Sequence, residues 1–144
     1  MIRRLDHVAV AVADTERALS HFCGRLGLSV VSAEVLARPR VRLTYLDAGN
    51  AYIQLVEPLD DDSAVAYHLA EHGEGLHHVC FGVDDVEADA RGLAEERDAQ
   101  VNLASGRGRA SAFVPGPPRF GVRIECTEFK FKEDVDGNRG WLDD

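Results

Sequence analysis

The chain has 144 residues, of which 45% are hydrophobic and 28% are charged, a composition typical of one compact globular domain. No stretch approaches the roughly 18–20 consecutive apolar residues of a membrane-spanning helix, so a membrane bundle is excluded. The formal net charge of −9 disfavours a nucleic-acid partner. Three cysteines without a Cys-x-x-Cys pair indicate reduced thiols in a cytoplasmic protein and exclude a four-cysteine zinc site.

The first predicted elements are a strand over residues 5–14 and a helix directly behind it. Apolar residues alternate through the strand. The Asp14 carboxylate can accept hydrogen bonds from the backbone at the helix start, and Gly27 can end the helix. The residues at helical spacing that we expect on its buried face are Ala18, Leu19, Phe22, Cys23 and Leu26. Further strands are predicted over residues 28–34, 41–46 and 51–57.

Two segments fall outside the strand pattern. Residues 59–74 form a linker, in which Ser63 and Gly73 predict the start and the end of a short helix. Residues 129–144 are polar and contain glycine, which indicates a tail whose one expected anchor is Trp141.

The second half of the chain has the same order of predicted elements. A strand over residues 76–85 leads into a helix that starts near Asp84, with Glu87 expected to complete a capping box. The residues expected on the buried face of this helix are Val86, Ala90, Leu93 and Ala94. Further strands are predicted over residues 100–103, 110–114 and 121–129.

The two halves are repeats of one another. Residues 5–14 and residues 76–85 both begin with leucine, have histidine in third place and end with aspartate. The sequence therefore predicts an α+β fold of two βαβββ modules, over residues 3–58 and 75–128 of a single domain spanning 1–144. Neither module can enclose a site alone, so we expect the pair to form a curved eight-stranded half-barrel with a metal-binding groove.

Four polar residues keep the spacing of this repeat. His7 and His78 occupy matching positions, on the strand face opposite the helix. Gln54 and Glu125 follow them at equal intervals in the last strand of each module. Two imidazole nitrogens, an amide oxygen and a carboxylate oxygen suit a divalent ion such as Co²⁺, Mn²⁺, Ni²⁺, Zn²⁺ or Fe²⁺, with positions open for a substrate. His77 competes with His78 as a ligand, and strand parity favours His78.

The remaining histidines are expected only at the surface or in packing. They are His21, His68 and His72.

Several short sequence motifs resemble those of a known family. They include Gln-Leu-x-Glu-Pro-Leu over residues 54–59 and Gly-x-Gly-x-His-His over residues 73–78. With residues 5–12, 62–66 and 84–88, they make the chain similar to the vicinal oxygen chelate (glyoxalase/bleomycin resistance/dioxygenase) superfamily and, within it, to the methylmalonyl-CoA epimerases. The resemblance implies one divalent metal ion (Co, Mn, Ni or Zn) with four ligands, the same four that the repeat selects: His7, Gln54, His78 and Glu125.

The resemblance also implies an activity, that of an isomerase (racemase/epimerase) which removes the α-proton of a methylmalonyl-CoA-type thioester through a metal-stabilised enolate. It implies Glu125 as the catalytic base, an acyl-CoA substrate and a homodimer. Some family members have a second catalytic glutamate where this chain has Leu43. That difference leaves the second proton carrier open, with Tyr45 and Glu34 as candidates.

An anionic substrate would need positive charge near the groove of this acidic protein. Arg123 shares a strand face with Glu125 and is expected to contact the substrate, with a structural ion pair as the alternative. Arg42 and Tyr45 complete the set of substrate-binding candidates, although Arg42 also fits a solvated sheet edge. The loop arginines Arg107 and Arg109 can hold phosphate or carboxylate groups as well.

Other functions fit the same scaffold. A glyoxalase I-like lyase would have a glutamate in place of Gln54. An Fe(II) extradiol-type dioxygenase would use a triad of His7, His78 and Glu125, with Gln54 not coordinating. A non-catalytic small-molecule binding protein would account for the missing second glutamate.

Overall fold

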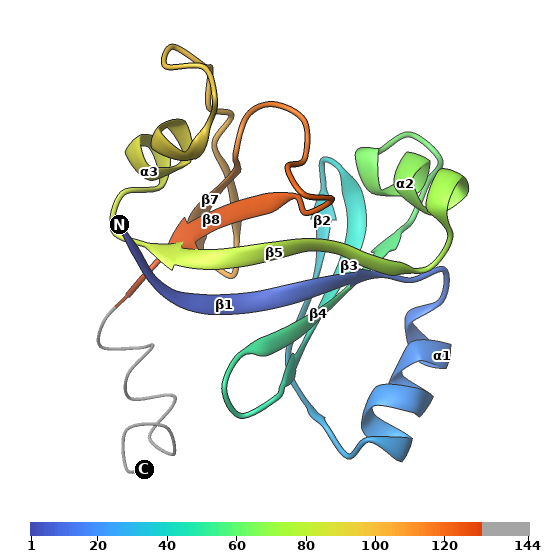
Figure 1. Cartoon of the computed structure of the whole chain (residues 1–144). Coiled ribbons are helices and arrows are strands. Elements are labelled where there is room, and N and C mark those ends of the chain that lie inside the picture. The colour runs from blue at the N-terminus through green and yellow to red at the C-terminus, as the bar shows by residue number, and fades with distance from the viewer. Residues whose placement is uncertain (131–144) are drawn as a thin grey trace. The chain divides into compact units, whose positions relative to one another are not determined.

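The computed structural model describes residues 1–130, and the expected tail beyond them, with Trp141, lies outside the described residues (Figure 1). The strands are β1 (Ile2–Ala11), β2 (Ser29–Ala37), β3 (Arg40–Asp47), β4 (Tyr52–Pro58), β5 (Gly75–Val83), β6 (Ala104–Gly106), β7 (Arg109–Phe113) and β8 (Ile124–Glu128). The helices are α1 (Thr15–Leu19), α2 (Ala64–His72) and α3 (Val86–Leu93), and a π-helical turn, η1 (Ser20–Arg25), follows α1.

The order of these elements is strand, helix and three strands, then α2, then strand, helix and three strands again. Backbone hydrogen bonds join the strands into one eight-stranded sheet in the order β2-β3-β4-β1-β5-β8-β7-β6. The sheet is mixed, because β5 and β8 are parallel while β7 is antiparallel to β8. The expected α+β fold of paired βαβββ modules is therefore confirmed.

The described chain divides into two compact units. The first contains residues 8–77, and the second contains residues 1–7 together with the chain from residue 78 onward. The boundaries between the units fall within β1 and β5, so each of these two strands belongs partly to one unit and partly to the other.

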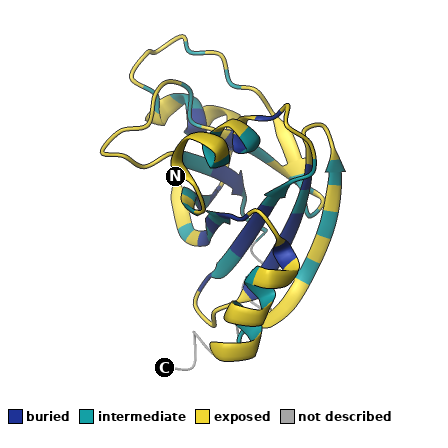
Figure 2. Cartoon of the chain, turned by 90° about the vertical axis from the view of Figure 1, so that its right-hand side faces the viewer, coloured by how far each residue is buried: buried dark blue, intermediate teal, exposed yellow. Residues whose placement is uncertain are grey.

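In the unit of residues 8–77, β2, β3 and β4 form an antiparallel meander. The edge strand β2 alternates between exposed and half-buried residues, whereas β3 is largely buried (Figure 2). One face of this sheet carries an apolar cluster that includes Ala9, Leu43 and Tyr45. The other face packs Leu46 and Leu55 against the helix that follows β1. Successive residues of β1 also face these two clusters in turn, as the sequence predicts.

The helix after β1 begins as expected and then departs from α-helical geometry. Asp14 caps α1 by accepting a hydrogen bond from the backbone N–H of Arg17 at 3.3 Å. The last turn is π-helical, since the N–H of Leu26 donates to the carbonyl of His21, five residues earlier. This wider turn changes the direction, around the helix axis, in which the residues that follow it point. The expected burial of Leu26 is therefore wrong: its side chain is 57% exposed, and Leu28 packs against the cluster instead.

The linker helix forms where the sequence predicts it. Ser63 accepts a hydrogen bond from the backbone N–H of Ala66 at 3.1 Å, and α2 ends at Gly73, whose φ of 77° suits glycine.

In the second unit, β8 lies between β5 and β7. The second strand of this half is shorter and later than expected, because residues 100–103 form no strand and β6 begins at Ala104. Only residues 124–128 of the predicted 121–129 strand join the sheet. The segment before them contains Phe120 and Gly121, both with positive φ, which interrupts extended pairing.

Helix α3 covers one face of this second sheet by packing Val86 and Ala90 against Val83 and Cys126. Its cap differs from the expected one: Asp85 accepts the hydrogen bond from Ala88 N–H, and Asp89 accepts one from Asp85 N–H.

The rest of the expected α3 pattern also differs. Glu87 pairs with Arg91 at 3.0 Å instead of closing a capping box. The expected burial of Leu93 is wrong, because this last residue of the helix is 41% exposed, whereas the C-cap residue Ala94 is half-buried. Among the described residues, no helix has the length and apolar character needed to cross a membrane.

Candidate metal centre and active site

Three of the predicted metal ligands come together in the second unit. His7 lies on β1, His78 on β5 and Glu125 on β8, and these strands are direct neighbours in the sheet. The parallel register of β5 and β8 pairs Cys80 with Glu125. Neighbouring strands of a sheet place side chains of the same face side by side, so three separate segments of the chain supply one cluster.

The distances within this cluster are those of ligands around one ion. His7 Nε2 lies 3.4 Å from Glu125 Oε1 and 3.3 Å from His78 Nε2. His78 Nε2 lies 3.5 Å from the same Glu125 oxygen. Metal–ligand bonds of roughly 2.1 Å place neighbouring ligand atoms about 3.0–3.5 Å apart, so the donor set fits a divalent transition-metal ion. The side chains of His7 and His78 are 2% and 5% exposed, and that of Glu125 is 15% exposed.

The electrostatic environment keeps Glu125 ionised. Burial alone would raise the pKa of its carboxyl group, but hydrogen bonds from His7 and His78, and the charges of these rings, hold that pKa far below its usual range. Burial lowers the pKa of His78, which favours its neutral ring. An anionic carboxylate beside a neutral imidazole is the state in which both groups bind metal.

The ring of His7 is held by a buried carboxylate that the sequence analysis missed. His7 Nδ1 lies 2.7 Å from Asp6 Oδ2, and Asp6 also accepts a hydrogen bond from Arg107 Nη2. Burial alone would lower the pKa of His7, but hydrogen bonds with Asp6 and Glu125 raise it. The position that matches Asp6 in the second half of the chain is His77. Both halves therefore have a polar side chain directly before the candidate histidine ligand, and this was the signal for Asp6 in the repeat.

A second group of potential ligands includes Asp6, His7 and the thiol of Cys80. Burial, together with the neighbouring carboxylates, raises the pKa of Cys80 well above its ordinary value. The protonated thiol is a poor ligand, which favours the group formed by His7, His78 and Glu125.

Gln54, the fourth predicted ligand, belongs to the unit of residues 8–77 and lies on β4. Its side chain is 4% exposed, and its Nε2 donates to the hydroxyl of Tyr45 at 2.7 Å. The amide oxygen Oε1 is buried and has no hydrogen-bond partner among residues 1–130. An oxygen in this state can serve as a ligand to a cation or accept a hydrogen bond from a substrate.

The other candidates in this unit lie on neighbouring strands. Tyr45 is buried and stands opposite Gln54 in the register of β3 and β4. Arg42 forms an ion pair with Glu57 at 3.6 Å. Leu43, where some family members have the second glutamate, is part of the apolar core. Glu34 stands opposite Leu43 on β2 and is half-buried.

Arg123 directly precedes β8, and His77 lies near the start of β5. The guanidinium of Arg123 lies 5.8 Å from the centre of the Phe113 ring, whose edge contacts the ring of His78. His77 belongs to the unit of residues 8–77, where its ring contacts that of His68 on α2, with ring centres 4.7 Å apart.

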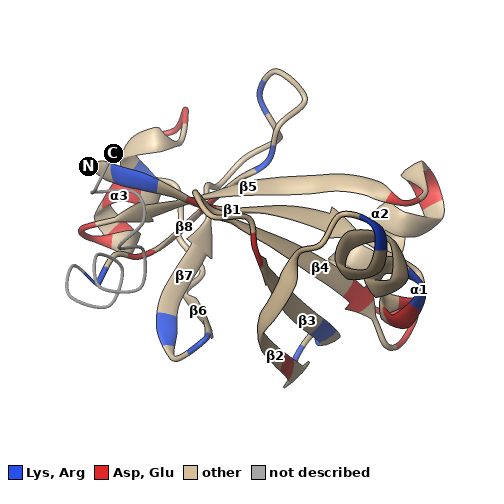
Figure 3. Cartoon of the chain, turned by 90° about the horizontal axis from the view of Figure 1, so that it is seen from below, with Lys and Arg blue, Asp and Glu red and all other residues tan. Residues whose placement is uncertain are grey.

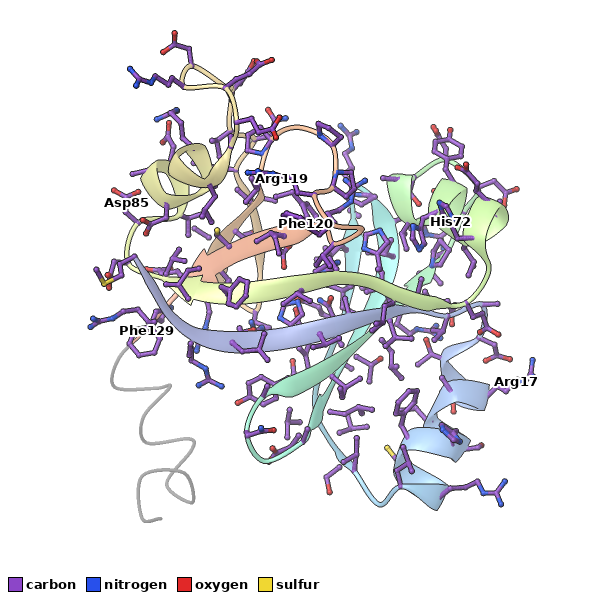
Figure 4. The ribbon with its side chains drawn as sticks, viewed as in Figure 1. Arg17, His72, Asp85, Arg119, Phe120 and Phe129 are labelled. Carbon is purple, nitrogen blue, oxygen red and sulfur yellow. The ribbon has the colours of Figure 1, made fainter. Side chains whose placement is uncertain are left out.

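The second unit also contains a cavity of about 680 Å³, lined mainly by apolar residues. Phe81, Leu93 and Val114 line it, as do Arg119 and Glu95, which form an ion pair at 3.3 Å. Figure 4 labels Arg119 and Phe120 in the loop before β8. No pattern in the sequence predicts this cavity.

Comparison with known proteins gives one family match. Residues 6–113 match the glyoxalase/bleomycin resistance protein/dioxygenase superfamily.

Two relatives are similar over much of the chain. An ethylmalonyl-CoA/methylmalonyl-CoA epimerase from Cereibacter sphaeroides is 35% identical over 113 residues, which cover 78% of this chain and 83% of the relative. The human mitochondrial methylmalonyl-CoA epimerase is 35% identical over 95 residues, covering 65% of this chain and 54% of that protein. The chain thus matches about half the length of the human relative.

A solved structure of similar fold comes from Streptomyces coelicolor. It is a variant of methylmalonyl-CoA epimerase in complex with 2-nitronate-propionyl-CoA, with a TM-score of 0.76 and 31% sequence identity. The similarity covers 89% of this chain and 98% of that chain.

Proposed function

Because the chain belongs to the glyoxalase/bleomycin resistance protein/dioxygenase superfamily, we propose that its metal centre inverts the α-carbon of a methylmalonyl-CoA-type thioester. The enzyme class, an isomerase of the epimerase type, follows from the similarity to epimerases over most of the chain. The observation that supports this reaction most directly is the approach of His7 Nε2, His78 Nε2 and Glu125 Oε1 to within 3.5 Å of one another.

We propose that one divalent ion, Co²⁺, Mn²⁺, Ni²⁺ or Zn²⁺, has four ligands in this chain. The buried Oε1 of Gln54, which has no hydrogen-bond partner within residues 1–130, supports Gln54 as the fourth ligand. Bound there, the ion would supply positive charge that stabilises an enolate oxygen as the α-proton leaves. The proposed ligands are His7, Gln54, His78 and Glu125.

Glu125 is the proposed base that accepts the α-proton. Hydrogen bonds from the two histidines keep its carboxyl group ionised, and its side chain, 15% exposed, is less enclosed than those of His7 and His78. Inversion also needs a group that returns a proton to the opposite face of the α-carbon. Tyr45 and Glu34 are the proposed candidates for this second role, since Leu43 cannot transfer a proton.

The proposed substrate is an anionic acyl-CoA. Arg123 supports this choice because its positive charge lies beside Phe113 and close enough to lower the pKa of His78. Arg42 and Tyr45 are proposed as further contacts. We also propose a homodimer in the cytoplasm, which light scattering of the purified protein and fractionation of cells can test.

One observation favours a second candidate function. Two histidines and one carboxylate in a single cluster are the ligand set of non-haem Fe(II) oxygenases. An extradiol-type dioxygenase would use these three ligands and leave Gln54 to contact the substrate. Consumption of O₂ that depends on Fe²⁺ would identify this function.

Exchange of the α-proton of methylmalonyl-CoA for deuterium tests the epimerase proposal. The metal-loaded protein in D₂O should increase the substrate mass by one unit per exchanged proton, and a chelator should stop the exchange. Glu125→Gln should abolish exchange, because the amide cannot accept the proton. Absence of exchange with Co²⁺, Mn²⁺, Ni²⁺ and Zn²⁺ alike would overturn the proposed function.

A further inference from the structure

The β6–β7 hairpin has an unusual residue in its turn. Gly106 pairs with Arg109, so Arg107 and Gly108 form a two-residue turn. Both turn residues have positive φ, 55° for Arg107 and 70° for Gly108, which is the pattern of a type I′ turn. Glycine, asparagine and aspartate adopt this conformation readily, whereas arginine does not. Figure 3 shows the positive charge at this end of the hairpin.

The Arg107 side chain reaches a residue 101 positions away in the sequence. Its Nη2 donates to Asp6 Oδ2 at 2.5 Å, and the two side chains are 15% and 2% exposed. The same carboxylate oxygen lies 2.7 Å from His7 Nδ1. One atom of Asp6 therefore connects the hairpin turn to the imidazole of His7.

The contact with Asp6 determines which nitrogen of His7 faces the cluster. The Asp6 carboxyl group is buried and lies within hydrogen-bond distance of both His7 Nδ1 and Arg107 Nη2. In the tautomer with its proton on Nδ1, His7 donates to Asp6, and Nε2, which lies 3.3 Å from His78 Nε2 and 3.4 Å from Glu125 Oε1, is the nitrogen left to bind an ion. Carboxylates that orient metal-binding histidines are often held by further hydrogen bonds, as Asp6 is by Arg107.

We propose that Arg107 is a positioning residue for the metal ligand His7. By holding Asp6, it fixes the orientation and the tautomer of the His7 ring before any ion binds. The inference rests on the metal centre of the proposed function. It concerns one of the two histidines, since the position equivalent to Asp6 in the second half is occupied by His77.

The variant Arg107→Gly separates this role from a structural one. Glycine suits the positive φ of the turn, so the turn itself should still form, although the buried Asp6 carboxylate loses a partner and the free energy of unfolding should fall. Loss of the guanidinium should nevertheless weaken Co²⁺ binding about 10–100-fold, measured by competition with a chelating dye. Arg107→Lys, which keeps a positive charge, should recover part of the affinity. Arg109→Gln changes the same charge in the same hairpin, where Arg109 contacts the Glu128 carbonyl, and should leave Co²⁺ affinity unchanged.

A measurement on the metal-free protein provides a second readout. Long-range ¹H–¹⁵N NMR of the His7 ring, at a pH high enough to keep the ring neutral, should show the Nδ1–H tautomer in the unchanged protein and a mixture of tautomers in Arg107→Gly. Unchanged Co²⁺ affinity together with an unchanged tautomer in Arg107→Gly would overturn the inference. Failure of the unchanged protein to bind any of the four ions would instead contradict the proposed metal centre. In that case the NMR result alone decides whether Arg107 positions His7.

Discussion

The Nε2 atoms of His7 and His78 lie 3.3 Å apart, although the two residues are 71 positions apart in the sequence. Their rings meet at an interplanar angle of 73°, with Glu125 in contact with both. Each ring therefore presents a nitrogen to the same small volume, which a cation can occupy.

Replacing His78 by alanine should abolish tight metal binding, because it removes one of three clustered ligand atoms. His77→Ala provides the matched control, since His77 neighbours His78 in sequence but contacts His68 in the other unit. It should leave metal affinity largely intact. Isothermal titration with Co²⁺ measures both. If His77→Ala abolished binding and His78→Ala did not, the choice of ligand would have to be reversed.

Gln54→Ala should weaken metal binding less than His78→Ala and should lower the rate of α-proton exchange, because it removes a neutral oxygen ligand. Tyr45→Phe keeps the amide but removes the hydroxyl that accepts from Gln54 Nε2. This change should lower the exchange rate by a smaller factor than Gln54→Ala. Rates and Co²⁺ affinities measured side by side check this order. Exchange at the unchanged rate in Gln54→Ala would argue against Gln54 as a ligand.

Metal affinity should increase with pH across the neutral range. The pKa of His7 is raised above its ordinary value of 6.5, and the ion can bind Nε2 only when the ring is neutral. Protons therefore compete with the ion at and above pH 6.5, and raising the pH removes this competition. Titrations with Co²⁺ at several pH values between about 6 and 8.5 test the slope. A constant affinity over this interval would contradict a raised pKa.

The metal-free protein should lose stability in acid through Glu125. Its folded-state pKa lies below the ordinary value of 4.5, so the group contributes stability above that value and loses it as the pH falls further toward the folded-state pKa. Glu125→Gln should unfold with a smaller dependence on pH below 4.5. Urea unfolding with a chelator present, at a series of pH values, measures the difference. Parallel curves for the two proteins would count against this linkage.

The π-helical turn makes a prediction about two leucines near the same cluster. Leu46 is fully buried, so Leu46→Ala should lower the free energy of unfolding by about 2–5 kcal/mol. Leu26→Ala should change it by less than about 0.5 kcal/mol, because the side chain is largely exposed. Chemical denaturation measures both. A large loss of stability in Leu26→Ala would mean that the last turn of the helix is α-helical in solution.

Much of the fold could be predicted from local patterns in the chain. Alternating apolar residues predicted β1 and β5, and the capping side chains of Asp14 and Ser63 predicted the starts of α1 and α2. These features depend on neighbouring residues, so a single sequence contains them. The elements predicted less well were β6 and the end of α3, where the chain leaves regular structure without a strong breaker such as proline.

By itself, the sequence determined the repeated βαβββ order, and it selected His7, Gln54, His78 and Glu125 as candidate ligands from their spacing. Strand periodicity and a duplicated motif are local properties, and they are visible in the order of residues. Only the tertiary structure decided that Arg107 contacts Asp6 and that Asp6 holds His7. That chain of contacts depends on where a hairpin turn with positive φ places a long side chain. Such a position follows from the packing of strands far apart in sequence, which no local pattern specifies.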